Sequence, residues 1–340
     1  MEGPEGAMKK YVLKRLLLIV PTFIGITFIT YFMIRVAPGD YTSLRAGLHG
    51  ELSQSAAMKE MIAQERKLYG LDKPIVVGYA EWLGRFMILD FGLSRKDKRP
   101  VLARIKDSLP ITLALNLITI LVIYVISIPL GILAAVRKDT VYDKGASLVL
   151  FILYSLPSFW VGLLLIMFLG SSEYGNLFPV AGIVSDWAEN AGFFTWLSNV
   201  MWHLVLPVVT LTYSGFAFLS RYTRANMLEV INQQYITTAR AKGLSEKKVV
   251  FVHAFRNSLV PLVTLMATLL PSLLGGSVIV EKIFSIPGMG RLAFEAILSR
   301  DIPVIMANAA VSALLTLIGI LLADLMYGLV DPRIRLEAEL

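Results

Sequence analysis

The sequence has no cysteine and only three histidines among its 340 residues. Disulfide bonds, thiolate chemistry and cysteine-ligated metals are therefore excluded, and a metal centre built on histidine is not expected. Charged residues are also scarce, at 17% of the chain, whereas ordinary globular domains carry about 25%. With 56% hydrophobic residues and a mean hydropathy of +0.67, the composition argues against a water-soluble globule and indicates a membrane protein.

The chain also lacks the sequence signals of catalysis. The phosphate-binding pattern G-x-x-x-x-G-K-[ST] does not occur, because GLSRKD at Gly92 and GLSEKK at Gly243 lack both the second glycine and the Lys–Ser/Thr pair. Paired carboxylates, a nucleophile elbow and metal-ligand spacing do not stand out either. We therefore expect no catalytic residue, no bound cofactor and no metal on this chain.

Six long apolar runs dominate the sequence, at residues 16–36, 109–136, 146–170, 202–220, 259–280 and 303–330. A helix rises about 1.5 Å per residue, so about 20 residues cross a bilayer core of about 30 Å. Five of the runs contain prolines, which a spanning helix tolerates when its neighbours satisfy the freed carbonyl. Pro110 and Pro303 are expected at helix starts. The pattern predicts a packed bundle of six transmembrane helices.

The lysines and arginines predict the orientation of this bundle. They gather before the first run, after the second, between the fourth and fifth and after the sixth, whereas residues 171–201 contain none. The positive-inside rule then places both termini in the cytoplasm, and the net charge of +7 is mainly a topology signal. The predicted organisation is a cytoplasmic tail (1–15), helix 1 (16–36), an extracytoplasmic helical loop region (37–108), a core with helices 2–6 (109–330) and a cytoplasmic tail (331–340).

Two helices are expected inside the region 37–108. Ser53 can cap the first, and Gly70 stands where a left-handed residue would end it. Apolar residues from Ile75 to Met87 recur at i, i+3 and i+4, which predicts a second helix that is too short to span a bilayer. We interpret the region as a small extracytoplasmic cap.

The segment YITTARAKGLSEKKVVFVHAFRNSLVP, between Tyr235 and Pro261, is basic and yet interleaved with valine and phenylalanine. Gly243 is expected to break a first amphipathic helix, and Ser245 to cap a second helix over about 246–255. That second helix presents a short apolar and aromatic face on the cytoplasmic side. The face needs a cover, which either a groove in a protein or the surface of an anionic bilayer can provide.

Polar side chains recur at helical spacing inside the apolar runs, where they either line a wet path or join helices by hydrogen bonds. The candidates for a translocation path are Asn116, Thr119, Ser214, Thr264, Thr268, Asn308 and Ser312. Charge is rare in these runs. Asp324, near the end of the sixth, is expected to meet Arg333 or solvent, and Arg35 to snorkel from the end of the first. A path with so little fixed charge suits substrates that are recognised elsewhere.

TARAKGLSEKKV, followed by HAFRN and a proline, resembles the cytoplasmic signature loop of ABC-transporter permease subunits in the dipeptide/oligopeptide branch. Further blocks that resemble this family follow in order along nearly the whole chain: KRLLLIVPTFIGITFITYFMIRVAPGD, KDSLPITL, SIPLGILAAVRKDTVYDK, EKIFSIPGMGRL, SRDIPV and DLMYGLVDPRIR. Across importers the loop reads E-A-A, three residues and then glycine. Here Thr237, Thr238 and Ala239 precede Gly243, so an acidic contact at Thr237 is not assumed.

The resemblance implies an all-α integral membrane protein with the type I ABC importer permease fold, in the bacterial inner membrane. It implies one half of a translocation path that works by alternating access. The implied partners are a second homologous permease subunit, two cytoplasmic ATPase subunits that hold ATP and Mg²⁺, and an extracytoplasmic substrate-binding protein; no nucleic acid is expected. Peptides are the expected substrate. Nickel chelates, oligosaccharides and a stand-alone channel or secondary transporter stay open as alternatives.

The resemblance also assigns an ATPase-coupling loop within residues 221–258. Its expected members are Thr238, Ala239, Arg240, Lys242, Gly243, Leu244, Ser245, Glu246, Lys247, Lys248, His253, Arg256 and Asn257. Gly243 is placed at a chain reversal, which needs positive φ or close backbone approach. The basic members are open to two interpretations, contact with ATPase carboxylates or with lipid, and His253 to packing between helices.

Overall fold

The computed structural model describes residues 4–36, 60, 72–171, 173–269 and 277–330. These residues are almost entirely helical and form no strand, and one isolated bridge pairs Leu93 with Pro100. The long helices are α1 (Pro4–Val36), α5 (Val101–Val136), α8 (Phe193–Ile231) and α14 (Ile302–Val330). The shorter elements are α4 (Ile75–Met87), α6 (Val141–Ser155), α7 (Ser158–Leu165), η2 (Ile166–Gly170), η3 (Asp186–Ala188), α9 (Gln234–Ala241), α10 (Glu246–Lys248), η4 (Val249–Ala254), α11 (Phe255–Leu269), α12 (Val278–Ile283) and α13 (Met289–Leu298).

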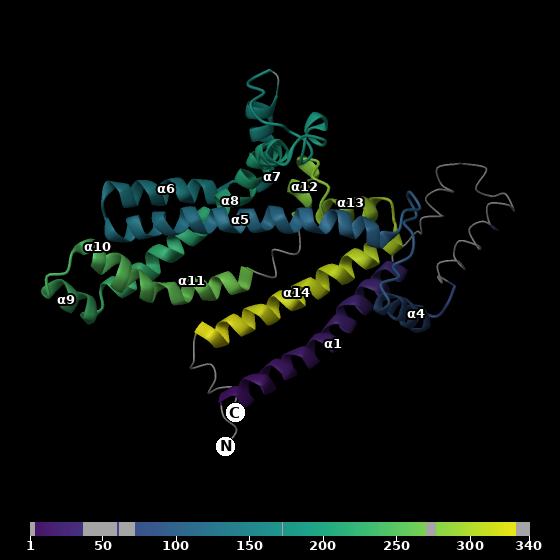
Figure 1. The fold of residues 1–340 in the computed structure, drawn as a ribbon, viewed down its shortest axis with the longest axis horizontal. Coiled ribbons are helices and arrows are strands. Elements are labelled where there is room, and N and C mark those ends of the chain that lie inside the picture. The colour runs from purple at the N-terminus through teal and green to yellow at the C-terminus, as the bar shows by residue number, and fades with distance from the viewer. Residues whose placement is uncertain (1–3, 37–59, 61–71, 172, 270–276, 331–340) are drawn as a thin grey trace.

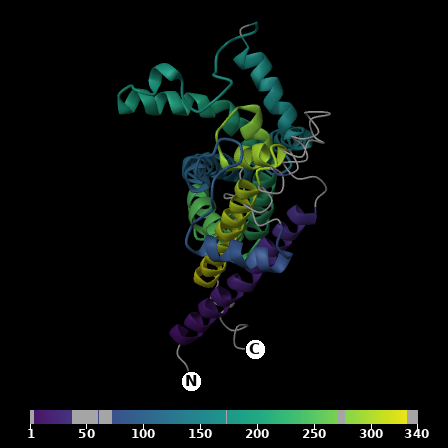
Figure 2. The same ribbon diagram turned by 90° about the vertical axis from the view of Figure 1, so that its right-hand side faces the viewer.

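The long helices form two packed pairs. α5 packs along α8, and α14 packs against both α1 and α11 (Figures 1 and 2). Buried apolar side chains such as Leu115, Leu206 and Phe284 fill the space where α12 meets α5 and α8. One end of the molecule carries α9 and α10 and the other carries α4 and α13, which we call the coupling end and the opposite end (Figure 1).

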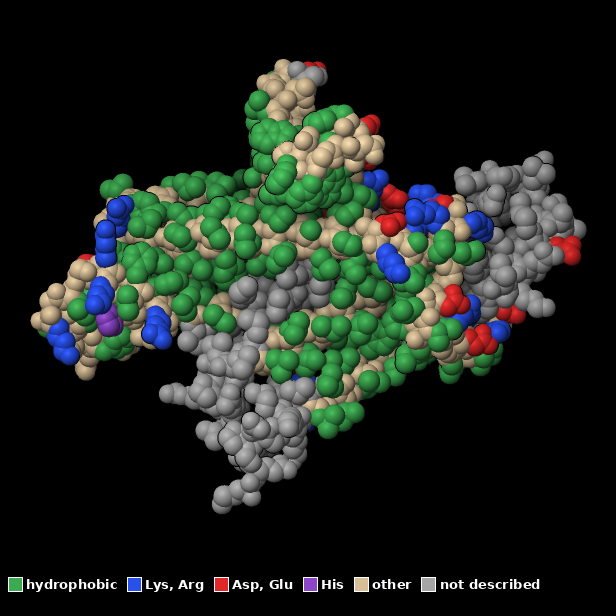
Figure 3. All heavy atoms as spheres, in the orientation of Figure 1, with side chains coloured by type: hydrophobic (Ala, Val, Ile, Leu, Met, Phe, Trp, Pro, Cys, Tyr) green, Lys and Arg blue, Asp and Glu red, His purple; other side chains and the backbone are tan. Residues whose placement is uncertain are grey.

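Charge and apolar surface are separated along this long direction. In Figure 3 the charged side chains gather at the two ends, and hydrophobic side chains cover the length between them. Four described helices are long and apolar enough to cross a membrane: Leu13–Val36, Val101–Val136, Phe193–Ile231 and Ile302–Leu325. The all-helical membrane fold is thus confirmed. The predicted fifth span, 259–280, includes residues 270–276 outside the described part, so the count of six stays a prediction.

The predicted single span 146–170 is wrong as drawn from the sequence. It consists of α6 and the α7–η2 helix, which meet at a bend of 94°, the geometry of a broken span or of a re-entrant loop. Pro157 lies at the break, where it has no N–H to donate to the carbonyl of Leu153. Leu156, the residue before the proline, adopts an extended conformation with ψ of 134°, as the proline ring demands.

α1 begins at Pro4, ahead of the predicted start of its apolar run at 16, and α5 and α8 also extend beyond their runs. α5 begins at Val101 after the extended Pro100, so Pro110 lies inside the helix and the prediction of a helix start there is wrong. α8 covers the predicted span 202–220 and continues to Ile231 as an amphipathic helix that buries Thr223 and Met227. Hydropathy missed these extensions because the added turns carry charged side chains that nevertheless continue the helix.

The first and last long helices, α1 and α14, pack on each other (Figure 1). Arg15 Nε in α1 lies 3.2 Å from Asp324 Oδ2 in α14. The neighbouring helix therefore supplies a cation to Asp324 that the sequence did not predict, and Arg333, the partner considered from the sequence, falls outside the described residues. The predicted short helix Ile75–Met87 is confirmed as α4, and its Tyr79 hydroxyl lies 2.9 Å from Thr27 Oγ1 of α1. The helix expected between Ser53 and Gly70 falls outside the described residues.

Candidate functional site

The coupling end is built from a helix, a sharp turn and a second helical stretch. α9 ends at Ala241, and Gly243 follows with φ of 75°, which confirms the expected left-handed position. Ser245 is the N-cap residue of α10, but its hydroxyl makes no capping hydrogen bond. The predicted helix 246–255 also does not end in a loop. α10 continues through the π-helical turns of η4 directly into α11.

One side of this stretch is anchored in the bundle. Val249, Val250 and Ala254 of η4 are buried in a cluster with Ile132 of α5 and Met227 of α8. Ile236 and Ala239 of α9 belong to the same cluster. The Ser258 hydroxyl of α11 also donates to Met227 Sδ at 3.1 Å. The buried side therefore joins the turn to α5, α8 and α11 together.

The other side faces outward and carries the apolar residues that were expected to need a cover. Phe251 is 57% exposed and Val252 is 48% exposed. Exposed basic side chains flank them, namely Lys247, Lys248 and Arg256. We call these five residues the coupling face. An aromatic anchor within a rim of cations has the chemistry of a protein contact site.

An ion pair fixes the turn between α9 and α10. Arg240 donates from Nη2 to Glu246 Oε1 at 2.7 Å and from Nε to Oε2 at 3.2 Å. These hydrogen bonds from Arg240 hold the pKa of Glu246 below its ordinary value. The sequence left Arg240 open between contact with ATPase carboxylates and contact with lipid, and in this structure it binds a carboxylate of its own chain.

The remaining members of the predicted loop divide by exposure. His253 and Leu244 are half-buried, and Ala239 is buried, so these three support the fold of the turn. The Asn257 amide donates to the Tyr235 hydroxyl at 2.8 Å. The exposed members are Thr238, Arg240, Lys242, Gly243, Ser245, Glu246, Lys247, Lys248, Arg256 and Asn257. The structure brings the whole set together at one end of the molecule.

The predicted path residues are spread over several helices. In α5, Thr119 donates to the carbonyl of Leu115 at 2.8 Å within its own helix, and Asn116 is half-buried. Asn308 of α14 is buried, and its Oδ1 has no hydrogen-bond partner among the described residues. Ser214 and Ser312 are half-buried. The side chains of Thr264 and Thr268 in α11 lie outside the described residues, and lining of a path by the set stays a prediction.

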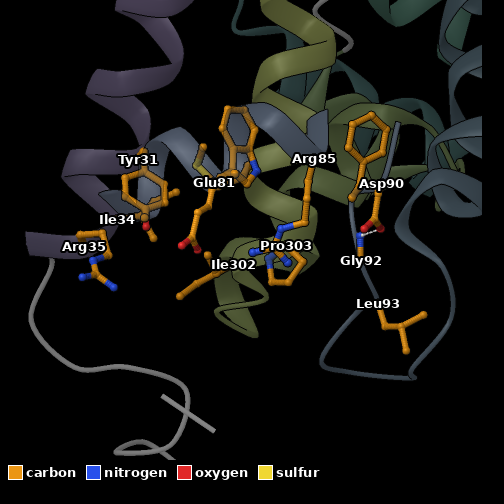
Figure 4. A pocket seen from close by; sticks show the side chains of 14 residues that line it. Tyr31, Ile34, Arg35, Glu81, Arg85, Asp90, Gly92, Leu93, Ile302 and Pro303 are labelled. Carbon is orange, nitrogen blue, oxygen red and sulfur yellow. Dashed lines mark hydrogen bonds between the residues drawn. The ribbon is translucent and has the colours of Figure 1, made fainter. Parts of the chain in front are cut away.

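The opposite end contains a cavity of about 140 Å³ between α1, α4, α14 and the loop after α4 (Figure 4). Tyr31, Trp82 and Phe91 supply aromatic walls, and Arg35, Glu81, Arg85 and Asp90 supply charges of both signs. Arg35 also donates to the carbonyl of Lys73 at 2.5 Å and lies over the Tyr31 ring, and its snorkelling stays a prediction. Walls of this mixed chemistry suit a polar macromolecular contact.

Sequence reasoning missed two buried carboxylates near that end. Glu281 is fully buried and accepts hydrogen bonds from Thr112 Oγ1 at 3.0 Å and from the backbone N–H of Arg291 at 2.8 Å. Asp301 accepts from Ser94 Oγ at 2.5 Å and from the N–H of Arg95 at 3.0 Å. Glu281 lies in EKIFSIPGMGRL and Asp301 in SRDIPV, and a carboxylate beside an apolar run was the available signal in each block.

Apolar helices with charged ends, and an anchored basic turn at one end, define a multi-pass membrane permease. Residues 127–336 match the family described as binding-protein-dependent transport system inner membrane component, and residues 8–116 match its N-terminal region. The chain belongs to this family and is an inner-membrane permease subunit, which is not itself catalytic.

Two curated relatives align over almost their full length. The oligopeptide transport system permease protein AppB of Bacillus subtilis is 42% identical over 96% of this chain and 99% of its own. The dipeptide transport system permease protein DppB of Escherichia coli K12 is 36% identical over 96% of this chain and 99% of its own. Among solved structures, an inward-facing MetNI methionine ABC transporter aligns with a TM-score of 0.47 and 20% identity, over 69% of this chain and 96% of that one.

Proposed function

We propose that this chain forms half of the translocation path of an ATP-driven peptide importer, with an ATPase subunit seated on the coupling face. The two-sided structure of η4 supports this most directly. Its inner side is buried on α5 and α8, while Phe251 and Val252 point outward among cations. Such a face complements a groove with an apolar floor and an acidic margin.

Force applied at the coupling face would reach the bundle without a flexible joint. η4 continues into α11, and its buried valines pack on α5 and α8. ATP-driven closure of two partner ATPases would therefore move these helices as one body and alternate the access of the path. ATP and Mg²⁺ would bind on those partners, because this chain has no phosphate-binding loop. A second homologous permease would complete the path.

Peptides are the proposed cargo, delivered by an extracytoplasmic binding protein at the opposite end. The two curated relatives carry dipeptide and oligopeptide transport in their names, and they align over 96% of this chain. The mixed aromatic and charged surface around Tyr31, Trp82 and Arg85 suits such a protein contact. Uptake of labelled di- to pentapeptides by cells that express the complete transporter tests this cargo, and unchanged uptake after deletion of this chain excludes it.

Charge reversal tests the ATPase contact. Lys247→Glu with Lys248→Glu places two negative charges beside Phe251, and we expect at least tenfold less ATPase to co-purify and peptide uptake to fall in parallel. Lys138→Glu with Lys144→Glu is the matched control, because Lys138 is exposed on the turn after α5 and Lys144 is exposed at the start of α6. Full assembly and transport by the Lys247/Lys248 variant contradicts the proposed seat.

A further inference from the structure

A groove separate from the coupling face opens between α5, α6 and α8. It encloses about 250 Å³. Leu130 and Ala134 of α5 and Val149 and Leu150 of α6 form apolar walls, and Ser220 and Arg221 of α8 lie on the third side. The three helices pack directly on one another, so the groove is a property of this chain.

Two polar groups of α8 reach this groove without a partner. Ser220 is 2% exposed, and its hydroxyl has no hydrogen-bond partner among the described residues. Hydroxyl groups in a helix usually donate to a backbone carbonyl of the preceding turn. Thr210 and Thr223 do so in this same helix, each to the carbonyl four residues earlier at 2.8 Å. The Ser220 hydroxyl is therefore a buried donor that awaits an acceptor.

Arg221 is the second such group. Its neighbour Arg224 is held by both carboxylate oxygens of Asp143, at 2.7 Å each. Arg221 is exposed and forms no ion pair within the described part of the chain. A cation beside an apolar groove attracts an anion that carries an apolar tail.

The surroundings identify where that anion comes from. The outward side of α6 is apolar, with Leu148 and Phe151 well exposed, so lipid chains surround the groove. The nearby turn after α5 carries Arg137 and Lys138, and the start of α6 carries Lys144, which marks the cytoplasmic boundary of the bilayer. Lipid phosphates of the inner leaflet lie at that depth.

We propose that this groove binds an anionic phospholipid of the inner leaflet. One acyl chain fills the space between Leu130, Ala134 and Leu150, and the phosphate pairs with Arg221. The Ser220 hydroxyl donates to an ester oxygen of the same lipid. The site is independent of what the transporter carries.

Native mass spectrometry of the complete transporter from phosphatidylglycerol nanodiscs measures the bound lipid directly. Arg221→Gln removes the phosphate partner, and we expect roughly fivefold less retained phosphatidylglycerol, as the loss of one lipid-facing cation predicts. Ala146→Phe fills the groove, and we expect a similar loss. Lys144→Gln removes an exposed cation of the same end and should change retention less than twofold. Phosphatidylcholine carries the same phosphate but no net charge, so its nanodiscs should give a weaker dependence on Arg221 than phosphatidylglycerol nanodiscs.

Two outcomes overturn the proposal. One is equal retention by wild type and Arg221→Gln, or an equal loss in Lys144→Gln, which would show adventitious lipid only. The other concerns the occupant. A photo-crosslinker at Leu150 should label a phospholipid, and labelling of a second permease subunit instead would show that a helix fills the groove. Arg221 is exposed, so its variant is expected to fold, and assembly with the ATPases checks this independently of peptide uptake.

Discussion

At Gly131, α5 lies so close to α8 that a single added methyl group should force the two helices apart. A Cβ at Gly131 would lie 2.6 Å from the backbone oxygen of Ser220, 2.6 Å from Thr223 Cβ and 2.9 Å from Thr223 Cγ2. Comfortable separations are about 3.5–4.0 Å, so the contact is about 1 Å too short. A carbonyl oxygen and a Cβ cannot rotate away, and Gly131→Ala must therefore push the two helices apart.

The expected change in the free energy of unfolding is the sum of two opposing effects, overpacking and helix propensity. Overpacking of a tight site costs about 1–3 kcal/mol, and a contact made with backbone belongs at the upper end of that range. Alanine recovers roughly 1 kcal/mol of helix propensity relative to glycine. We expect Gly131→Ala to lower the free energy of unfolding by about 2 kcal/mol. Gly145→Ala in α6 is the matched control, because its Cβ would meet nothing within 4 Å, and it should be neutral or slightly stabilising.

Reversible unfolding of the purified chain in mixed micelles, titrated with denaturing detergent, compares the two variants with wild type. The difference between the two variants should be about 2–3 kcal/mol, from the overpacking and propensity terms together. Equal stability of Gly131→Ala and Gly145→Ala would refute the assigned contact, because helix propensity alone predicts the same gain at both positions.

Three further predictions concern polar contacts. Asp143→Ala should lower the free energy of unfolding by about 2–3 kcal/mol. This is less than the roughly 3–5 kcal/mol expected for a fully buried ion pair, because the Arg224 side chain is 28% exposed. In a double-mutant cycle with Arg224→Ala, most of this loss should appear as coupling energy between the two residues. Gly243→Ala should lower the free energy of unfolding by about 1 kcal/mol, because φ at this position is 75° and the space around it is open. Asparagine tolerates this φ better than alanine does, so Gly243→Asn should restore the ATPase co-purification that the alanine variant weakens. Partial burial would raise the pKa of Asp97, but hydrogen bonds from Arg104 and a backbone N–H lower it to about 2. The stabilisation from Asp97 is therefore full above its unfolded pKa near 3.8 and lost as the pH falls through about 2, and Asp97→Asn should remove this acid-dependent part of an unfolding curve.

Hydropathy predicted the long helices because a bilayer-length apolar run has few other structures available to it. Hydropathy failed where a helix is not apolar and where an apolar run is not one continuous helix. The first turns of α5 and the last turns of α8 are helical but polar, and the bend at Pro157 interrupts a run that is apolar throughout. A proline in an apolar run predicts a distortion, but whether neighbouring helices keep the chain straight or let it turn by 94° depends on tertiary contacts.

In the candidate site, too, some features could be predicted from the sequence and others could not. Gly243 was predictable because a basic, interrupted helical pattern requires a reversal, and its φ of 75° agrees. The partner of Asp324 could not be predicted from the sequence. Arg15 lies more than 300 residues away along the chain, and the packing of α1 on α14 brings the two side chains together. The unpaired Ser220 hydroxyl likewise had no sequence signal, because a serine in an apolar helix ordinarily bonds its own backbone.

The buried contacts of η4 determine which helices would move when the coupling face is displaced. Val249 and Val250 are buried with Ile132 of α5 and Met227 of α8, and Gly131 lets those two helices approach more closely than any side chain would permit. α5, α8 and α11 are therefore joined near the coupling face by packed apolar atoms, which resist bending more than a hinge of loop residues does. α1 is attached through a different cluster, in which Phe23 packs with residues of α14. A displacement that begins at Phe251 thus acts first on the α5–α8 pair, and it reaches α1 through the contacts of α1 with α14 and α4.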